Sequence, residues 1–247
     1  GGVTGDELNV RLIKCNRDYC VAKIEEVITP STYRTADPCD APLSCGGCAY
    51  RGVDYAHELE LKRQDVEHAF RKAGLREVEV EPVRTNGQTA GYRNKAQYPV
   101  TSRKGTAYAG FFKAGTHQVV ENSRCLILPE ESDQVKDAVV DYVNQFRVSV
   151  YDETTHTGLL RHIYVRRGAV SGQLLVCLCV NGQKLPHGEK LIEKLQNIPG
   201  FTTLVLSVNT RPGNAVLGEE FITLHGPGYI EDTLCGLNFR LSPRSFY

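Results

Sequence analysis

Three cysteines in one short segment are the residues best suited to chemistry in this chain of 247 residues. Cys39, Cys45 and Cys48 read C-x5-C-G-G-C, and the last two are close enough to share one metal centre. The Gly46-Gly47 pair between them allows a tight turn because glycine tolerates positive φ. Backbone N–H groups in such a turn can offset the charge of thiolate ligands. Cys125, which we place just before a helix, is our choice for a fourth ligand.

Four thiolates fit either a tetrahedral zinc ion or an iron–sulfur cluster. Structural zinc sites often combine two separate C-x2-C pairs, whereas this chain has one such pair, a C-x5 arm and a distant cysteine. The spacing therefore favours an iron–sulfur cluster over zinc. The other cysteines are expected to be structural, and two of them alternate along one apolar strand; the five are Cys15, Cys20, Cys177, Cys179 and Cys235.

Two stretches of the chain, 82–120 and 154–188, contain basic residues but no Asp or Glu. Basic side chains interleaved with aromatic rings suit RNA, because phosphates attract the cations and unstacked bases stack on flat rings. The alternative is a solvated sheet face whose composition arose by chance, and a net charge of zero argues weakly against a nucleic-acid binder. The residues that we expect to contact RNA are Arg93, Lys95, Lys113, His117, Arg161 and His162.

The bulk composition is that of a folded protein with no membrane segment. Hydrophobic residues make up 41% and charged residues 23% of the chain, and no apolar run approaches the ~20 residues of a membrane span. No signal peptide is visible at the start, so we expect a cytoplasmic protein. The sequence contains no Met, so either the chain starts inside a longer protein or methionine positions are missing from it.

The hydrophobic patterns predict an α+β fold. Asp54 as N-cap and Gly74 after the last turn delimit a helix over 55–73. A second helix is expected from Pro129, with acidic residues in its first turn, and a short third one near 187–197. Alternation over residues 7–29 predicts two strands joined around 16–18. Further strands are predicted at 77–83, 92–100, 106–112, 117–120, 160–167, 173–180, 202–209, 214–224 and 237–242.

Five motifs together resemble the 23S ribosomal RNA (uracil-5-)-methyltransferases, and the resemblance covers nearly the whole chain. They are Asp37-Pro38-Cys39…Cys45-Gly46-Gly47-Cys48, Gly91-Tyr92-Arg93-Asn94-Lys95, Gly110-Phe111-Phe112…His117, Leu160-Arg161-His162 and Ser242-Pro243-Arg244-Ser245-Phe246. The first and the last are fairly specific to that family.

The resemblance implies a domain plan. Residues 1–35 would be the end of a TRAM domain, an OB-like barrel that binds RNA. Residues 36–241 would form the central RNA-binding domain, with a [4Fe–4S] cluster on Cys39, Cys45, Cys48 and Cys125. Residues 242–247 would begin an S-adenosylmethionine-binding Rossmann-like domain that is otherwise absent. The 55–73 helix packs on the catalytic domain in that family, so we expect Val66 and Phe70 to lack cover here.

The resemblance also implies an activity, the transfer of a methyl group from S-adenosylmethionine to C5 of uridine in ribosomal RNA. The family's cysteine nucleophile and glutamate base lie further downstream, so this chain is expected to be inactive alone and to supply the RNA surface and the cluster. The full-length protein is expected to be a monomer. The alternatives are a non-catalytic RNA-binding module with zinc or a cluster, and an electron-transfer protein.

Overall fold

The computed structural model describes residues 1–246, so Tyr247, the end of the predicted 242–247 segment, lies outside it. The chain divides into two compact units. Unit 1 comprises residues 1–38 and 48–87, and unit 2 comprises residues 39–47 and the chain from residue 88 onward. Within residues 1–246 no helix is long and apolar enough to cross a membrane.

Unit 1 begins with a two-stranded antiparallel sheet made of β1 (Glu7–Cys15) and β2 (Cys20–Thr29). Both strands and the turn between them were predicted. Next to the hairpin, the buried carboxylate of Asp6 accepts hydrogen bonds from the Ser31 N–H and the Arg34 guanidinium, and this ion pair lowers the pKa of Asp6. The described residues pair only two strands here, so the expected OB-like barrel stays a prediction.

Helix α1 (Tyr55–Lys72) has the predicted ends. The Asp54 side chain accepts a hydrogen bond from the His57 N–H at 3.1 Å, and Gly74 adopts φ +83° after the last turn. No residue of α1 is buried: Val66 is 46% exposed, as we expected, and Phe70 is half-buried. The docking of this helix on a catalytic domain stays a prediction.

The strand that we predicted at 77–83 is wrong. This segment has no regular structure and its side chains are mostly exposed. Its alternation comes from Glu and Val in turn, but Pro82 has no N–H to donate. An alternating segment forms a strand only when another strand takes up its backbone hydrogen bonds, and none of the described residues does so here.

Unit 2 is built on a seven-stranded mixed sheet, which confirms the α+β class. Its strand order is β5-β4-β3-β6-β7-β8-β9, and every neighbouring pair is antiparallel except β7 and β8. The strands are β3 (Lys95–Arg103), β4 (Thr106–Phe112), β5 (Val119–Glu121), β6 (Leu160–Arg167), β7 (Leu174–Val180), β8 (Phe201–Val208) and β9 (Glu220–His225). The parallel pair needs a crossover, which helix α3 (Gly188–Leu195) supplies.

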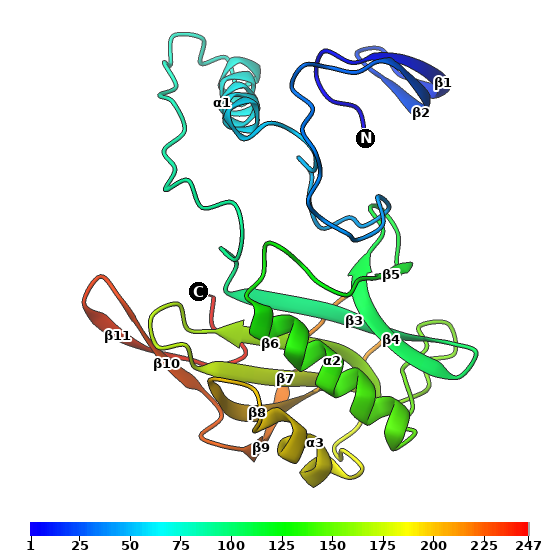
Figure 1. Cartoon of the computed structure of the whole chain (residues 1–247), viewed down its shortest axis with the longest axis vertical. Coiled ribbons are helices and arrows are strands. Elements are labelled where there is room, and N and C mark those ends of the chain that lie inside the picture. Colours follow the sequence, from blue (N-terminus) through cyan, green and yellow to red (C-terminus); the bar gives the residue numbers. More distant parts are fainter. Residues whose placement is uncertain (247) are drawn as a thin grey trace. The chain divides into compact units, whose positions relative to one another are not determined.

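Helices α2 (Glu130–Gln145) and α3 lie on one face of this sheet (Figure 1). The apolar stripe that we predicted on α2 is buried at Val135, Val139, Tyr142 and Val143. It packs against residues of β3, β4, β6, β7 and β8 in one continuous core. Burying an aliphatic side chain contributes about 1.5–3 kcal/mol, so this core is the main source of stability in unit 2.

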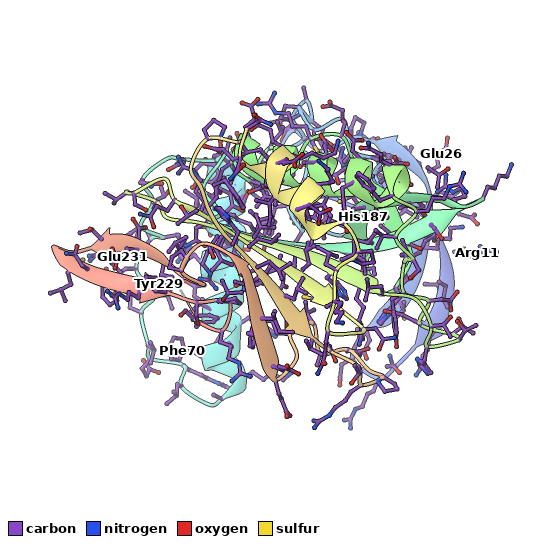
Figure 2. The ribbon with its side chains drawn as sticks, turned by 90° about the horizontal axis from the view of Figure 1, so that it is seen from below. Arg11, Glu26, Phe70, His187, Tyr229 and Glu231 are labelled. Atoms are coloured by element: carbon purple, nitrogen blue, oxygen red, sulfur yellow. The ribbon has the colours of Figure 1, made fainter. Side chains whose placement is uncertain are left out.

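The opposite face of the sheet is covered in part by a hairpin of β10 (Ile230–Leu234) and β11 (Leu237–Leu241). Ile230 and Leu241 are buried in a cluster with Tyr164 of β6 and Cys177 of β7. Figure 2 shows Tyr229 and Glu231 on this hairpin, which projects from the sheet. We predicted β11 but missed β10, because two acidic residues interrupt its apolar pattern, and β9 starts later than the predicted 214.

Gly110 allows β4 and β5 to approach each other closely. A Cβ atom at this position would lie 1.9 Å from the Val120 carbonyl oxygen, which is backbone and cannot rotate away. We therefore expect Gly110→Ala to lower the free energy of unfolding by about 2–4 kcal/mol in urea denaturation. Gly188→Ala is the control, because its Cβ would meet side chains at ordinary distances from 3.7 Å. Equal stability of the two variants would contradict this packing.

Candidate functional site

The face of β3 and β6 that points away from the two helices carries the polar residues of the sheet. Paired residues of antiparallel strands lie on the same face. The register sets Lys95 opposite Arg166, Gln97 opposite Tyr164, and Pro99 opposite His162. The neighbouring positions Ala96, Tyr98, Ile163 and Val165 point into the helix-covered core. We call the six outward residues the β3–β6 polar face.

Arg166 lies at one end of the β3–β6 polar face and is 1% exposed. Its guanidinium donates to the Tyr164 hydroxyl and to the Ser245 carbonyl. Its Nε and Nη1 atoms have no partner among the described residues. The side chain of Lys95 lies beside it, with its ammonium 6.0 Å from the centre of the Phe246 ring. This end of the face therefore holds buried positive charge next to the Ser242–Phe246 segment.

Arg161 is buried, and its guanidinium is used inside the protein. It donates to the carbonyls of Asn209, Arg211 and Gly213 at 2.8–3.2 Å and lies 4.3 Å from the centre of the Tyr151 ring. Its Nη1 and Nη2 atoms therefore hold the 209–213 loop, while its Nε has no partner among the described residues. The structure thus places Arg161 beneath the surface at which we expected RNA contact.

His117 and His162 lie close enough for the charge of one to affect the pKa of the other. The exposed His117 ring is bonded to the Glu153 carboxylate at 2.7 Å and stacks on Phe112 at 5.2 Å. His162 is half-buried on the β3–β6 polar face, and its Nδ1 has no partner among the described residues. Burial, followed by the positive charge of Arg161, lowers the pKa of His162 to about 4. His162 is therefore neutral at pH 7, and a neutral ring can stack on a base or accept a hydrogen bond.

Lys113 and Arg93 lie in loops that are fixed through their backbones. Lys113 is exposed directly after β4 and forms an isolated bridge with Cys45. The neighbouring Gly46 donates its N–H to the Phe112 carbonyl at 3.0 Å, and a Cβ there would approach that oxygen to 2.7 Å. Arg93 is exposed, and its N–H donates to the Ile127 carbonyl. Their side chains remain available to phosphate.

The loop that carries Cys125 is held by polar groups of α2. Asp133, 6% exposed, accepts hydrogen bonds from the Cys125 N–H at 2.8 Å and from the Tyr98 hydroxyl at 3.1 Å. Lys136, 3% exposed, donates to the carbonyls of Asn122 and Ser123. Burial raises the pKa of Asp133, and burial together with the Asp133 charge raises that of Tyr98. We call these contacts of Asp133 and Lys136 the α2 clamp.

The four predicted ligands are divided between the units. Cys39, Cys45 and Cys125 belong to unit 2 and are half-buried, whereas Cys48 belongs to unit 1. Within residues 1–246 no three Cys, His, Asp or Glu side chains form a group that could hold a metal ion. The expected packing role is confirmed for Cys177 and Cys179, which are buried in β7. It is wrong for the exposed Cys15, Cys20 and Cys235, which lie at the ends of the two hairpins and bury no surface in a core.

Comparison with known proteins adds independent information. This chain is similar to proteins named RNA methyltransferases. It is 37% identical over 248 residues to an uncharacterized RNA methyltransferase of Clostridium tetani, and 33% identical over 245 residues to one of Halalkalibacterium halodurans. These alignments cover 100% and 98% of this chain but 54% of each relative, so the chain spans about half the length of the curated relatives it matches.

A solved structure shares the fold. It is the Pyrococcus abyssi tRNA (uracil-54, C5)-methyltransferase in complex with S-adenosyl-L-homocysteine, with a TM-score of 0.72 and 23% identity over 100% of this chain and 55% of that one. No protein-family model matches the chain. The relatives support the resemblance to RNA methyltransferases, and the solved structure extends it to the fold.

Sequence reasoning missed the α2 clamp and Arg166. One signal was available for the clamp, since Ser132 and Lys136 lie three positions before Val135 and Val139, respectively, and interrupt the apolar stripe of the helix. Polar residues inside an apolar stripe are buried, and buried polar groups need partners. Nothing in the sequence distinguished the buried Arg166 from the half-exposed Arg167, which pairs with Glu131.

The lowered pKa of His162 predicts an acid-sensitive fold. Between pH 6.5 and 4 the unfolded chain binds a proton at this position and the folded chain does not, so stability falls as the pH falls. The loss should be on the order of 2–3 kcal/mol by pH 4. We expect His162→Gln to flatten the dependence of the urea midpoint on pH in this window. His68→Gln, at an exposed position of α1, should keep the wild-type dependence. A wild-type slope in His162→Gln would refute the assignment.

Proposed function

We propose that the whole protein is an S-adenosylmethionine-dependent RNA (uracil-5-)-methyltransferase that acts on 23S ribosomal RNA, and that this chain supplies its RNA-binding part. The observation that carries the proposal is the 37% identity to an RNA methyltransferase along the full length of this chain. The shared fold with a uracil-C5 methyltransferase of tRNA supports the choice of uracil C5.

Within this function the exposed Arg93 and Lys113 and the half-buried Lys95 bind the RNA backbone, with His117 beside them. The three cations would attract phosphates, and each neutralised phosphate adds to a salt-dependent affinity. The buried Arg161 would not contact the RNA itself but would fix the conformation of the 209–213 loop. The neutral His162 would contact a base or sugar. Such a surface suits RNA whose target uridine has left its stack.

The chemistry itself requires groups outside this chain. C5 of uracil is a poor nucleophile until a thiolate adds to C6. After C5 has taken up the methyl group, a base must remove the C5 proton so that the thiolate leaves C6 and the C5–C6 double bond forms again. S-adenosylmethionine supplies the methyl group when it is bound. We assign no catalytic role to the nine cysteines of this chain, and we expect the chain to be inactive without the catalytic half.

Methylation of defined RNAs tests the proposed function. The longer protein that contains this chain should transfer tritium from methyl-labelled S-adenosylmethionine to a 23S ribosomal RNA transcript, with 5-methyluridine as the product in nucleoside mass spectrometry. A tRNA transcript should remain unlabelled. Labelling of tRNA alone would overturn the ribosomal target, and no labelling of either RNA would overturn the function.

The surface cations give the same assay a second readout. Lys95→Ala with Lys113→Ala should raise the KM for RNA several-fold and reduce its salt dependence, with kcat little changed. Lys190→Ala is the matched control, because Lys190 is an exposed cation of α3 that pairs with Glu193. An unchanged KM in the double variant would remove these lysines from the RNA-binding surface.

We further propose a [4Fe–4S] cluster on Cys39, Cys45, Cys48 and Cys125. The C-x5-C-G-G-C motif supports it, and so do two loops of unit 2, because Gly46 and the α2 clamp fix the backbone next to Cys45 and at Cys125. The described residues do not by themselves form a metal-binding group. Metal binding would therefore have to draw the thiolates together, as it does in proteins in which metal binding completes folding.

Metal analysis tests the cluster separately from methylation. The protein purified without oxygen should contain about four iron and four sulfide per chain and show brown visible absorbance. Cys125→Ser should lose most of that absorbance, whereas Cys235→Ser, at an exposed hairpin turn, should retain it. Zinc without sulfide, or a Cys125→Ser protein with its cluster intact, would remove this assignment.

A further inference from the structure

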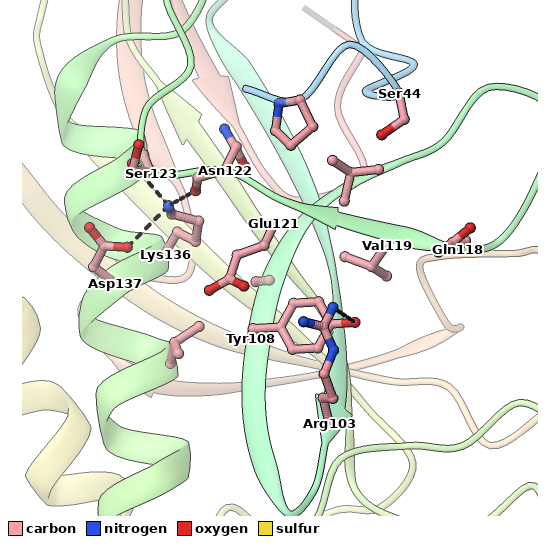
Figure 3. Close-up of a pocket in the computed structure, with 14 residues that line it drawn as sticks. Ser44, Arg103, Tyr108, Gln118, Val119, Glu121, Asn122, Ser123, Lys136 and Asp137 are labelled. Carbon is pink, nitrogen blue, oxygen red and sulfur yellow. Dashed lines mark hydrogen bonds and ion pairs between the residues drawn. The ribbon is translucent and has the colours of Figure 1, made fainter. Parts of the chain in front are cut away.

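Unit 2 contains a cavity of about 660 Å³ between α2 and the edge of the sheet at β4 and β5 (Figure 3). Its volume lies within the range of small-ligand sites. The walls come from the end of β3, from β4, from the 118–123 segment, from α2 and from the cysteine-bearing loop at Pro42 and Ser44. None of the functions assigned above uses this cavity.

One wall of the cavity is a flat stacking surface. The Arg103 guanidinium lies 4.9 Å from the centre of the Tyr108 ring, and its Nη2 is 3.4 Å from the Tyr108 hydroxyl. Figure 3 shows the two side chains against each other at the cavity. An aromatic ring paired with a guanidinium is a surface on which unstacked nucleobases bind, whatever their sequence context.

A second wall presents a hydrogen-bond acceptor in a fixed position. Asn122 is 5% exposed, and its side-chain Oδ1 has no partner among the described residues. Lys136 holds the Asn122 backbone carbonyl at 2.7 Å and the Ser123 carbonyl at 3.1 Å, so this wall is rigid. A buried acceptor without a donor is unfavourable, and a ligand that donates a hydrogen bond to it would remove that cost.

Negative charge adds to the acceptors. Glu121 lies in the middle of the cavity view of Figure 3, and its carboxylate forms no hydrogen bond or ion pair with the described residues. Asp137 lines the cavity as well, with its carboxylate 3.1 Å from the Lys136 ammonium. Arg103 and Lys136 line the same cavity and balance the two carboxylates, so the cavity suits an uncharged flat ligand with N–H donors on its edge.

We infer that this cavity binds an unstacked guanine of the RNA substrate, an inference that rests on the proposed function. The Watson–Crick edge of guanine carries adjacent N1–H and N2–H donors, which match the two oxygens of one carboxylate, here Glu121. The guanine ring would stack on Tyr108, and its remaining amino hydrogen would reach Asn122 Oδ1. Inosine lacks the N2 amino group, so it offers one donor where guanine offers three.

A fluorescent variant reports on the cavity directly. The chain has no Trp, so Tyr108→Trp introduces a single reporter that keeps a flat ring on the wall. Titration of this variant with the trinucleotide UGU should quench the fluorescence saturably, and the inosine analogue UIU should bind about tenfold more weakly, as expected for the loss of part of a bidentate contact. Absence of saturable quenching by UGU, or equal binding of UGU and UIU, would overturn the inference.

A second substitution in the Tyr108→Trp background assigns the preference to Glu121. Glu121→Gln should bring the affinity for UGU down to that for UIU, because an amide cannot accept on both atoms. Glu193→Gln, on an exposed face of α3, is the charge-matched control and should keep the tenfold preference. A preference that survives Glu121→Gln would exclude this carboxylate. The readout uses this chain and needs neither methyl transfer nor ribosomal RNA. Absence of RNA methylation by the longer protein, with the preference of this chain for UGU intact, would refute the proposed function and leave the cavity assignment standing.

Discussion

The α2 clamp is the interaction on which the proposed sites in unit 2 depend. Asp133 and Lys136 are buried ionisable groups beside the apolar stripe of α2, and such groups are tolerated only when their hydrogen bonds are satisfied. They form hydrogen bonds with backbone groups of the loop between β5 and α2, so the loop is attached to the helix. The same loop supplies Cys125 on one side and the Asn122 wall of the cavity on the other. A single packing arrangement therefore fixes two separate candidate sites.

The two faces of the large sheet have different roles. The helix-covered face is a continuous apolar core and contributes stability. The opposite face is only partly covered by the β10–β11 hairpin, and β3 and β6 are polar there. Arg166 belongs to this face, yet it is buried by its contacts to Tyr164 and Ser245. A buried guanidinium with unpartnered N–H groups raises the local positive potential without exposing a flexible side chain, which suits a surface that attracts an anionic polymer.

The sequence was most informative where local rules decide the structure. Both ends of α1 follow from Asp54 and Gly74. Strands β4 and β6 have the predicted bounds, because each has the hydrophobic pattern of a strand and a neighbouring strand on both sides. Prediction failed where contacts with residues distant in the sequence decide the structure. Residues 77–83 alternate well but have no neighbour among the described strands. Strand β10 pairs with β11, and its Asp232 accepts hydrogen bonds from the backbone of 169–171, a contact across about 60 residues. The residue types and their spacing identified the candidate site residues but not their burial. Arg161, for example, is buried by a loop about 50 residues away in the sequence.

Strand order explains how a chain of zero net charge can present a cationic surface. The two acid-free stretches are more than 30 residues apart in sequence, with the acidic first turn of α2 between them. The first contains β3 and β4 and the second contains β6 and β7, and the sheet places these strands side by side in the order β4-β3-β6-β7. Antiparallel pairing of β3 with β6 merges two stretches into one area from which acidic residues are missing. Two separate compositional biases therefore become one set of neighbouring strands on folding, although Glu153, which is hydrogen-bonded to His117, places one carboxylate beside that area.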